Sequence, residues 1–272
     1  MSTKNAYNFL SFGQMTGQSK PEILLVNDDG FESPFLVHLA TALSDVASVH
    51  VVAPASEQSG VSHSFLGFHG HELSEVPGDY PFEFHTLTGT PSDCTKFALT
   101  YLYRNLHIDC VFSGPNKGEN SGVSSIYSGT VAGAREAALW GFPSLALSLC
   151  YDATETMEKE LLRFAVEVVN KKLYEKIPAH TFWNVNFPDE HRSKFAGFKA
   201  AGQGVSMFTD HFDLKDGKFF LSGAKVPERF AVNSDDLLLS QGYATITPMT
   251  IDQTLHSGLV PVQQVVDKFF IR

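Results

Sequence analysis

Long apolar runs are absent from this sequence of 272 residues, so it offers no segment of the roughly 20 apolar residues that a membrane-spanning helix needs. The first 20 residues, from Met1 to Lys20, are polar and lack the apolar stretch of a signal peptide. These two absences predict a cytoplasmic protein without a membrane partner. We interpret residues 1–20 as a flexible extension and residues 21–272 as a single α/β domain.

Cysteine and positive charge are also scarce. The three cysteines, Cys94, Cys110 and Cys150, show no C-x-x-C spacing and lie in apolar segments, which predicts buried free thiols rather than a disulfide framework or a catalytic thiol. Lys and Arg number 20 against 30 Asp and Glu, a net charge of -10. Because so acidic a chain repels a polyanion, we expect no long nucleic acid as a partner. A small phosphorylated ligand stays compatible, since a metal ion and backbone N–H groups reverse the potential locally.

Short apolar runs alternate with helical patterns over most of the chain. This alternation predicts an α/β fold, with a mostly parallel sheet covered by helices on both faces. Strands are expected at 23–26, 49–53, 82–87, 109–112, 144–149 and 182–186. Helices are expected at 34–43, 93–105, 128–140 and 154–174. Right-handed crossovers then bring the carboxyl ends of the strands, and the loops that follow them, to one edge of the sheet.

The pattern changes after about Gly197. Two aromatic-rich segments, 208–212 and 218–221, are separated by Lys215-Asp216-Gly217, which predicts a β-hairpin around an Asp-Gly turn. Its exposed aromatic side chains would be poorly covered in a single subunit, so we expect an arm at about 200–240 that packs on another subunit. A further strand is expected at 243–247, stopped by Pro248, and a short helix at 260–270.

Adjacent carboxylates, Asp28 and Asp29, follow the first predicted strand. Two such charges side by side are unfavourable without a cation, and oxygen ligands suit a hard divalent ion such as Mg²⁺ or Mn²⁺. The alternative is a helix cap beside a solvated turn acid, and the pair alone does not separate the two interpretations.

Three further polar segments follow at the same edge. The segments 54–60 and 113–122 come directly after strands and contain hydroxyl, amide and glycine residues, although either is compatible with an ordinary surface loop. The segment 127–131 opens a helix, where hydroxyls and free N–H groups favour a phosphate, and where Ser128 is also a plausible N-cap. Another polar turn, 89–93, has capping as its default role. The combination indicates metal-assisted attack on a phosphate ester.

Several ordered motifs together resemble the SurE (survival protein E) family of nucleotidases. They span about Glu22 to Thr254 and are Val26-Asn27-Asp28-Asp29-Gly30, Val52-Ala53-Pro54 with Gln58-Ser59-Gly60, Gly89-Thr90-Pro91-Ser92-Asp93-Cys94, Ser113-Gly114-Pro115-Asn116, Tyr127-Ser128-Gly129-Thr130-Val131, Asn184-Val185-Asn186-Phe187-Pro188, and Thr247-Pro248 with Asp252-Gln253-Thr254. So many motifs in order are hard to produce by chance.

The resemblance implies a Rossmann-like fold and hydrolysis of nucleoside 5′- and 3′-monophosphates with one divalent metal ion, Mg²⁺ or Mn²⁺, per subunit. It places the metal ligands at Asp28, Asp29, Ser59 and Asn116. It places the phosphate contacts at Asn120, Ser128, Gly129 and Thr130, with Asn120 also counted among the catalytic residues beside the two aspartates. It also implies a homodimer or homotetramer with an exchanged C-terminal arm. Departures from the family pattern at Glu57, Lys117 and Glu119 leave the substrate preference open.

Other functions remain compatible with parts of the pattern. A haloacid-dehalogenase-type phosphatase requires two aspartates separated by one residue, whereas Asp28 and Asp29 are adjacent. A receiver-like signalling module requires a phosphoacceptor aspartate after a central strand, where this chain has Ser113-Gly114. A non-catalytic nucleotide sensor on the same fold is a third alternative. His63, His211 and His256 are candidates for the acid that protonates the leaving group, although a structural role is the default for each.

Overall fold

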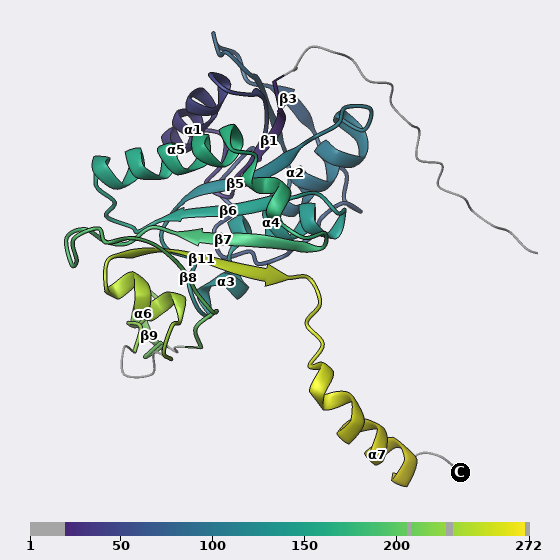
Figure 1. Ribbon diagram of the computed structural model, residues 1–272, viewed down its shortest axis with the longest axis vertical. Coiled ribbons are helices and arrows are strands. Elements are labelled where there is room, and N and C mark those ends of the chain that lie inside the picture. Colours follow the sequence, from purple (N-terminus) through teal and green to yellow (C-terminus); the bar gives the residue numbers. More distant parts are fainter. Residues whose placement is uncertain (1–19, 206–207, 227–230, 270–272) are drawn as a thin grey trace, which may run out of the picture.

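The computed structural model describes residues 20–205, 208–226 and 231–269, so the expected extension lies outside it except for Lys20. Within these ranges a central sheet has the order β3-β4-β2-β1-β5-β6-β7-β11-β8 (Figure 1). Its strands are β1 (Glu22–Val26), β2 (Ser48–Pro54), β3 (Leu73–Glu75), β4 (Glu83–Leu87), β5 (Cys110–Lys117), β6 (Ser144–Leu149), β7 (Thr181–Asn186), β8 (Gly197–Ala200) and β11 (Tyr243–Thr250).

The predicted parallel sheet is confirmed. Strands β4, β2, β1, β5, β6 and β7 are all parallel, while β3 and β11 run antiparallel to β4 and β7. From β1 the chain continues outward to β2 and β4 on one side, and from β5 it continues to β6 and β7 on the other. The direction of winding therefore reverses between β1 and β5. In open α/β sheets, ligands bind beyond the carboxyl ends of the strands at such a reversal.

Helices cover both faces of the sheet (Figure 1). Helices α1 (Pro34–Ser44) and α5 (Glu155–Asn170) pack together on one face, and α2 (Pro91–Phe97) and α4 (Gly129–Leu139) on the other. Side chains of β1 alternate between the two cores: Ile23 and Leu25 join one, and Leu24 and Val26 join the other. All four are fully buried, because a strand covered on both faces has no solvent side.

Two predicted helices end earlier than expected. Helix α2 stops at Phe97 and continues as a π-helical turn, Ala98–Leu102, rather than as α-helix to residue 105. Helix α5 stops at Asn170, and a 3₁₀ turn, Leu173–Lys176, follows it. The break at α5 falls where Lys172 adopts a left-handed backbone with φ of 50°, which no helix continues through.

The prediction that Pro248 stops a strand is wrong, because β11 continues to Thr250. On one side β11 pairs with β7 along this stretch, while its other neighbour β8 pairs only as far as Ile246. Pro248 therefore lies where one edge of β11 has no partner strand, and its missing N–H is not needed there.

The segment 113–122, expected as a loop, begins as strand. Strand β5 runs to Lys117, with an irregular register against β6 between Ser113 and Asn116. Gly114 has φ of 119°, and a Cβ there would lie 2.3 Å from the Leu147 carbonyl oxygen, so only glycine fits. Irregularities of this kind re-aim side chains at the end of a strand, which is where the candidate ligand Asn116 lies.

The predicted hairpin is confirmed as β9 (His211–Lys215) and β10 (Lys218–Ser222), joined by Asp216 and Gly217 with positive φ. Two short helices were not expected. They are α3 (Ser124–Tyr127), between β5 and α4, and α6 (Asp235–Ser240), between β10 and β11. After β11 a 3₁₀ turn, His256–Gly258, leads into α7 (Leu259–Phe269), which extends away from the body (Figure 1).

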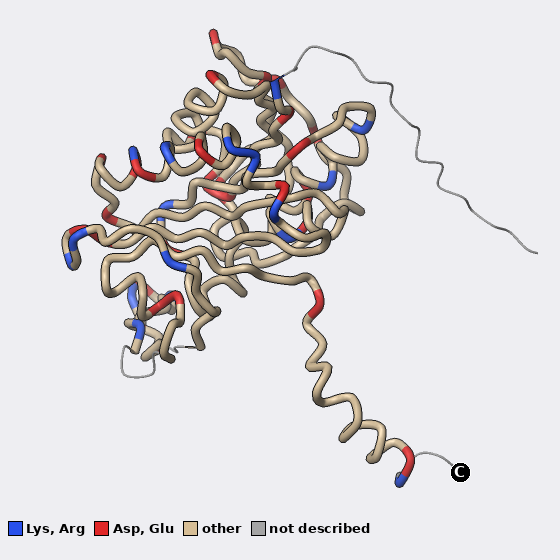
Figure 2. The backbone as a smooth tube through the Cα atoms, viewed as in Figure 1, with Lys and Arg blue, Asp and Glu red and all other residues tan. Residues whose placement is uncertain are grey.

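Charged residues of both signs are spread over the body, with Lys and Arg lying among Asp and Glu (Figure 2). On α7 the charges gather at the C-terminal end, at Asp267 and Lys268, while the rest of the helix is uncharged. None of the helices in the described ranges is long and apolar enough to cross a membrane.

Candidate metal and phosphate site

Asp28 follows β1 at the point where the winding of the sheet reverses. Its side chain is buried, and its carboxylate accepts hydrogen bonds from the Thr130 hydroxyl and, at 2.9 Å, from the Thr130 backbone N–H. Burial raises the pKa of Asp28 to about 6; the Thr130 hydroxyl opposes this effect, and the neighbouring charge of Asp29 adds to it. Asp28 is thus a buried carboxylate held in a fixed orientation.

Asp29 is partly exposed, and its Oδ2 accepts the Lys117 backbone N–H at 3.2 Å. Burial raises the pKa of Asp29, with the Lys117 N–H opposing it and the charge of Glu57 adding to it. Because the pKa of each carboxyl group is raised, the state in which both Asp28 and Asp29 are charged is unfavourable without a partner. A divalent cation relieves it, because the cation stabilises both charged forms.

The loop after β2 is fastened to the loop after β1. The Gln58 N–H donates to the Asp28 carbonyl at 2.7 Å, and the Phe31 N–H donates to the Pro54 carbonyl at 3.1 Å. The Ser59 hydroxyl donates to Glu57 at 2.8 Å, which leaves its oxygen lone pairs available to a ligand. The expected meeting of these two loops is confirmed.

Asn116 closes the site from the end of β5. Its amide nitrogen donates to the Gly118 carbonyl at 2.6 Å, so the amide oxygen is the atom left for a ligand. The next candidate along the chain, Asn120, is held by the strands beside β5. Its N–H donates to the Asn186 side chain at 2.6 Å, its carbonyl accepts from the Asn184 side chain at 2.8 Å, and its own amide donates to the Ser148 hydroxyl at 2.9 Å.

These contacts give a physical role to the motif Asn184-Val185-Asn186. Alternation along β7 places both asparagines on the same side of the sheet, where each binds the backbone of Asn120. Sequence reasoning had not assigned functional roles to Asn184, Asn186 or Ser148. The available signal was the pair of asparagines at spacing two inside a predicted buried strand, which requires polar partners nearby.

The start of α4 lies directly against Asp28. Ser128 caps the helix by accepting the Val131 N–H at 3.0 Å. A Cβ on Gly129 would lie 2.9 Å from the Asp28 Cβ, so a larger residue would displace the carboxylate. The two donors of Thr130 point to Asp28, and Thr130 itself is fully buried. Thr130 thus contacts the carboxylate, whereas Ser128 faces the space in front of it.

A cavity of about 610 Å³, within the range of small-molecule sites, brings these segments together. Five polar residues of its lining, which we call the polar floor, are Asp28, Ser59, Asn116, Asn120 and Ser128. The apolar residues of its lining, the apolar wall, are Tyr127, Phe208, Phe212 and Leu221, and Lys117 and Asp210 also line it. Phe212 and Leu221 come from the β9–β10 hairpin and are about two-thirds exposed, so their apolar surface is available to a ligand.

Not every sequence-predicted residue lines this cavity. Asp29, Gly129 and Thr130 border the floor through their contacts with Lys117 and Asp28. The three histidine candidates lie elsewhere: the His63 ring contacts Glu136 at 2.8 Å, the His211 ring the Thr209 carbonyl at 3.1 Å, and the His256 ring Asp252 at 2.7 Å. The polar turn 89–93 has its default role, because Thr90 and Asp93 form a capping box for α2.

The oxygen atoms at the floor fit a hard divalent cation. No group of three or more His, Cys, Asp or Glu side chains suited to a metal ion occurs in the ranges that the structure describes. The candidate set instead combines the carboxylates of Asp28 and Asp29 with the amide oxygen of Asn116 and the hydroxyl of Ser59. Such all-oxygen sets suit Mg²⁺ or Mn²⁺.

Comparisons with known proteins identify the family of the chain. Residues 23–210 match the family described as Survival protein SurE. The 5′-nucleotidase SurE of Campylobacter lari is 37% identical over 249 residues, covering 87% of this chain and 95% of the relative. The 5′-nucleotidase SurE of Petrotoga mobilis is 33% identical over 237 residues, covering 85% and 94%. The crystal structure of the SurE protein from Aquifex aeolicus, 32% identical, matches with a TM-score of 0.74 over 90% of this chain and 99% of that one. The chain therefore belongs to the SurE family.

Proposed function

We propose that this chain is a metal-dependent phosphomonoesterase that hydrolyses nucleoside 5′- and 3′-monophosphates to nucleoside and phosphate. The observation that carries the proposal is the cavity, in which a buried carboxylate, oxygen ligands and a helix start form the floor while aromatic side chains form the wall. A nucleotide has the same division between an anionic phosphate and an apolar base. The names of the relatives, 5′-nucleotidase SurE, support this choice.

The metal ligands in this proposal are Asp28, Asp29, Ser59 and Asn116. A Mg²⁺ or Mn²⁺ ion bound there supplies a Lewis acid for a phosphoryl oxygen and lowers the pKa of water. The chain's own carboxylates orient the attacking water, and either Asp28 or Asp29 accepts its proton. Thr130 holds the Asp28 carboxylate in place through two hydrogen bonds.

Asn120, Ser128 and Gly129 hold the phosphate oxygens. The Ser128 oxygen accepts the Val131 N–H, so its proton is left to donate to the phosphate. The positive end of the α4 dipole favours an anion at the same place. Both donors of Thr130, its hydroxyl and its N–H, bind Asp28. We therefore propose that Thr130 orients that carboxylate and does not contact the phosphate directly.

The base of the nucleotide would lie against the apolar wall. Phe208, Phe212 and Tyr127 offer aromatic faces, and stacking on such faces tolerates different bases. Departures such as Lys117, which lies 4.7 Å from the centre of the Tyr151 ring, are close enough to the cavity to influence which ester is preferred.

We further propose a homodimer or homotetramer in the cytoplasm. Exposed apolar side chains on the hairpin and on α7 support association: Phe219 is 71% exposed and Val260 is 68% exposed. The three cysteines, all free and buried, support a reducing compartment.

A substrate panel tests the function. Nucleoside 5′- and 3′-monophosphates are compared with other phosphate esters in Mg²⁺, Mn²⁺ or EDTA, by release of inorganic phosphate. Asp28→Asn should abolish metal-dependent release, and Asp45→Asn, an exposed aspartate after α1, is the matched control. Activity that survives in EDTA or in folded Asp28→Asn would contradict the proposal. A trapped aspartyl-phosphate would instead indicate a haloacid-dehalogenase-type phosphatase, and nucleotide binding without phosphate release would indicate a sensor.

A further inference from the structure

Lys225 lies at the base of the hairpin, just beyond β10. It forms an antiparallel bridge with Phe208, and its ammonium group lies 5.7 Å from the centre of the Phe208 ring. The adjacent Thr209 N–H donates to the Ala224 carbonyl at 2.9 Å. Phe208 belongs to the apolar wall, so Lys225 is in direct contact with that wall.

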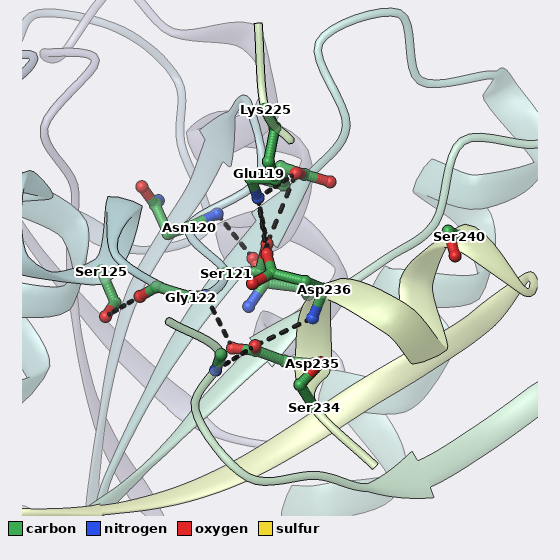
Figure 3. Close-up of polar contacts among 12 residues, drawn as sticks. Glu119, Asn120, Ser121, Gly122, Ser125, Lys225, Ser234, Asp235, Asp236 and Ser240 are labelled. Atoms are coloured by element: carbon green, nitrogen blue, oxygen red, sulfur yellow. Dashed lines mark hydrogen bonds and ion pairs between the residues drawn. The ribbon is translucent and has the colours of Figure 1, made fainter. Parts of the chain in front are cut away.

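The same ammonium group reaches three acceptors beside the polar floor (Figure 3). It donates to Glu119 at 2.7 Å, to the Ser121 hydroxyl at 2.8 Å and to Asp236 at 2.7 Å. Glu119 and Ser121 flank Asn120, a floor residue. Burial lowers the pKa of Lys225, but the two carboxylates outweigh it and the net pKa is raised, so the lysine stays charged. Lys225 thus joins the wall to the loop that carries Asn120.

The hairpin and the loop that carries Asn120 differ in how many other contacts hold them in place besides Lys225. The loop keeps its bonds from Asn120 to Asn184 and Asn186, and the Gly122 N–H keeps its bond to Asp235 at 2.9 Å (Figure 3). Strands β9 and β10 make extensive contacts only with each other among the described elements. Loss of Lys225 would leave the buried Asp236 carboxylate without its cation. It would release the hairpin more than the loop, because the loop keeps these other bonds.

We infer that Lys225 is a positioning residue that holds the apolar wall over the polar floor and so determines the affinity for the base part of a nucleotide. The nature of the ligand rests on the proposed function, whereas the attachment of the hairpin through Lys225 does not. Lys225 touches neither the metal ligands nor the phosphate contacts, so its effect falls on binding of the base rather than on phosphate chemistry.

Steady-state kinetics test the consequence for the ligand. Lys225→Met keeps most of the side-chain length without the charge, and Lys225→Arg keeps the charge. For AMP, we expect Lys225→Met to raise KM about tenfold with kcat within about threefold. For glycerol 3-phosphate, which has no base, KM should change by less than about threefold, and Lys225→Arg should recover most of the AMP affinity. Equal losses on both esters would overturn the inference.

Hydrogen exchange followed by mass spectrometry tests the attachment without any substrate. Lys225→Met should speed exchange in peptides covering 208–225 more than in those covering 119–125, which also lose a partner of Glu119 and Ser121. Glu119→Gln, at a side chain that is 38% exposed, should act in the same direction with a smaller effect and little risk to folding. Unchanged hairpin exchange in both variants would overturn the inference. If the wild-type protein hydrolyses neither ester, the proposed function fails, and hydrogen exchange still decides whether Lys225 holds the hairpin.

Discussion

At the residue scale, the most informative contact is between Thr130 and Asp28, which are 102 positions apart. One residue supplies two donors, a hydroxyl and a backbone N–H, to a single buried carboxylate. Carboxylates that ligate a metal are commonly held by a second set of hydrogen bonds that fixes their orientation. Thr130 would therefore act on the proposed metal site through Asp28, and it does not line the cavity.

Replacing Thr130 with Val tests this role, because the change removes the hydroxyl, keeps the shape and preserves the backbone N–H. Divalent metal affinity should fall by about 10- to 100-fold, since Asp28 loses one of its two orienting bonds. Titration with Mn²⁺, followed by calorimetry, measures the loss. Thr130→Ser keeps the hydroxyl and should bind nearly as the wild type does. A Val variant with unchanged metal affinity would refute the role.

Five residues that the sequence motifs proposed for the site line one cavity, but the sequence did not predict their individual contacts. Asp28, Ser59, Asn116, Asn120 and Ser128 were all selected from motifs, and the structure brings them to one cavity. Thr130 was expected to contact phosphate, because a helix start alone suggests an anion site. Its partner is a carboxylate of the same chain, and only the packing of the α4 start against the end of β1 reveals this.

At the element scale, α4 connects the site to its surroundings. Its first residues border Asp28, and near its other end Glu136 is buried. The Glu136 carboxylate contacts Lys96 at 2.6 Å, His63 at 2.8 Å and the Trp140 N–H at 2.9 Å. Burial raises the pKa of Glu136, but these hydrogen bonds outweigh it and bring the pKa to about 2. Helix α4 is therefore joined to α2 and to the loop around residue 63 through one charged group.

This carboxylate predicts a pH-dependent effect of Glu136→Gln. A depressed pKa contributes stability that is present above the unfolded value of about 4.5 and is lost as pH falls through about 2. At pH 7 the variant should lose at most about 3 kcal/mol of unfolding free energy relative to the wild type. This difference between the two proteins should become smaller between pH 4.5 and pH 2. Urea unfolding at pH 7 and pH 3 measures this difference, with Glu32→Gln, at an exposed glutamate between β1 and α1, as the control. A gap that is constant with pH would contradict this assignment.

Element boundaries show where sequence patterns stop being sufficient. Strands β1, β2, β6 and β7 were predicted to within about two residues because they are mainly apolar segments bounded by polar or turn residues. The continuation of β5 past Phe112 was missed, since Ser113-Gly114-Pro115 has the composition of a turn while its conformation is set by pairing with β6. Helix α6 is only six residues long and depends on capping by Ser234 and packing beside β11, so it lacks a long periodic signal.

At the scale of the whole molecule, two apolar segments lie apart from the central sheet. Helix α7 extends from the body and exposes Leu259, Val260, Val262 and Val265. Apart from the two side chains that line the cavity, the hairpin exposes Leu214 and Phe219. Exposed apolar surfaces of this kind mark contacts with other proteins. The hairpin lies within the predicted arm at about 200–240, whereas α7 lies beyond it.

Removing residues 255–272 should therefore reduce the assembly to smaller species, because it removes the apolar surface of α7. Size-exclusion chromatography with light scattering gives the molar mass directly. A chain lacking residues 1–19, which the sequence predicts to be an extension, is the control and should keep the wild-type mass. A full-sized assembly after loss of 255–272 would exclude α7 as an essential contact.

The floor and the wall of the cavity come from different parts of the fold. The floor is formed mainly by the ends of the central strands and the start of α4. The wall is formed largely by the β9–β10 hairpin and the residues beside it. Under the proposed function, bond cleavage and the choice of leaving group would therefore depend on different segments of the chain. Changes at Phe208, Phe212 or Leu221 would diversify the range of esters accepted while the hydrolytic centre is inherited intact. Exchanging the hairpin between two related proteins would therefore transfer the preference for particular phosphate esters.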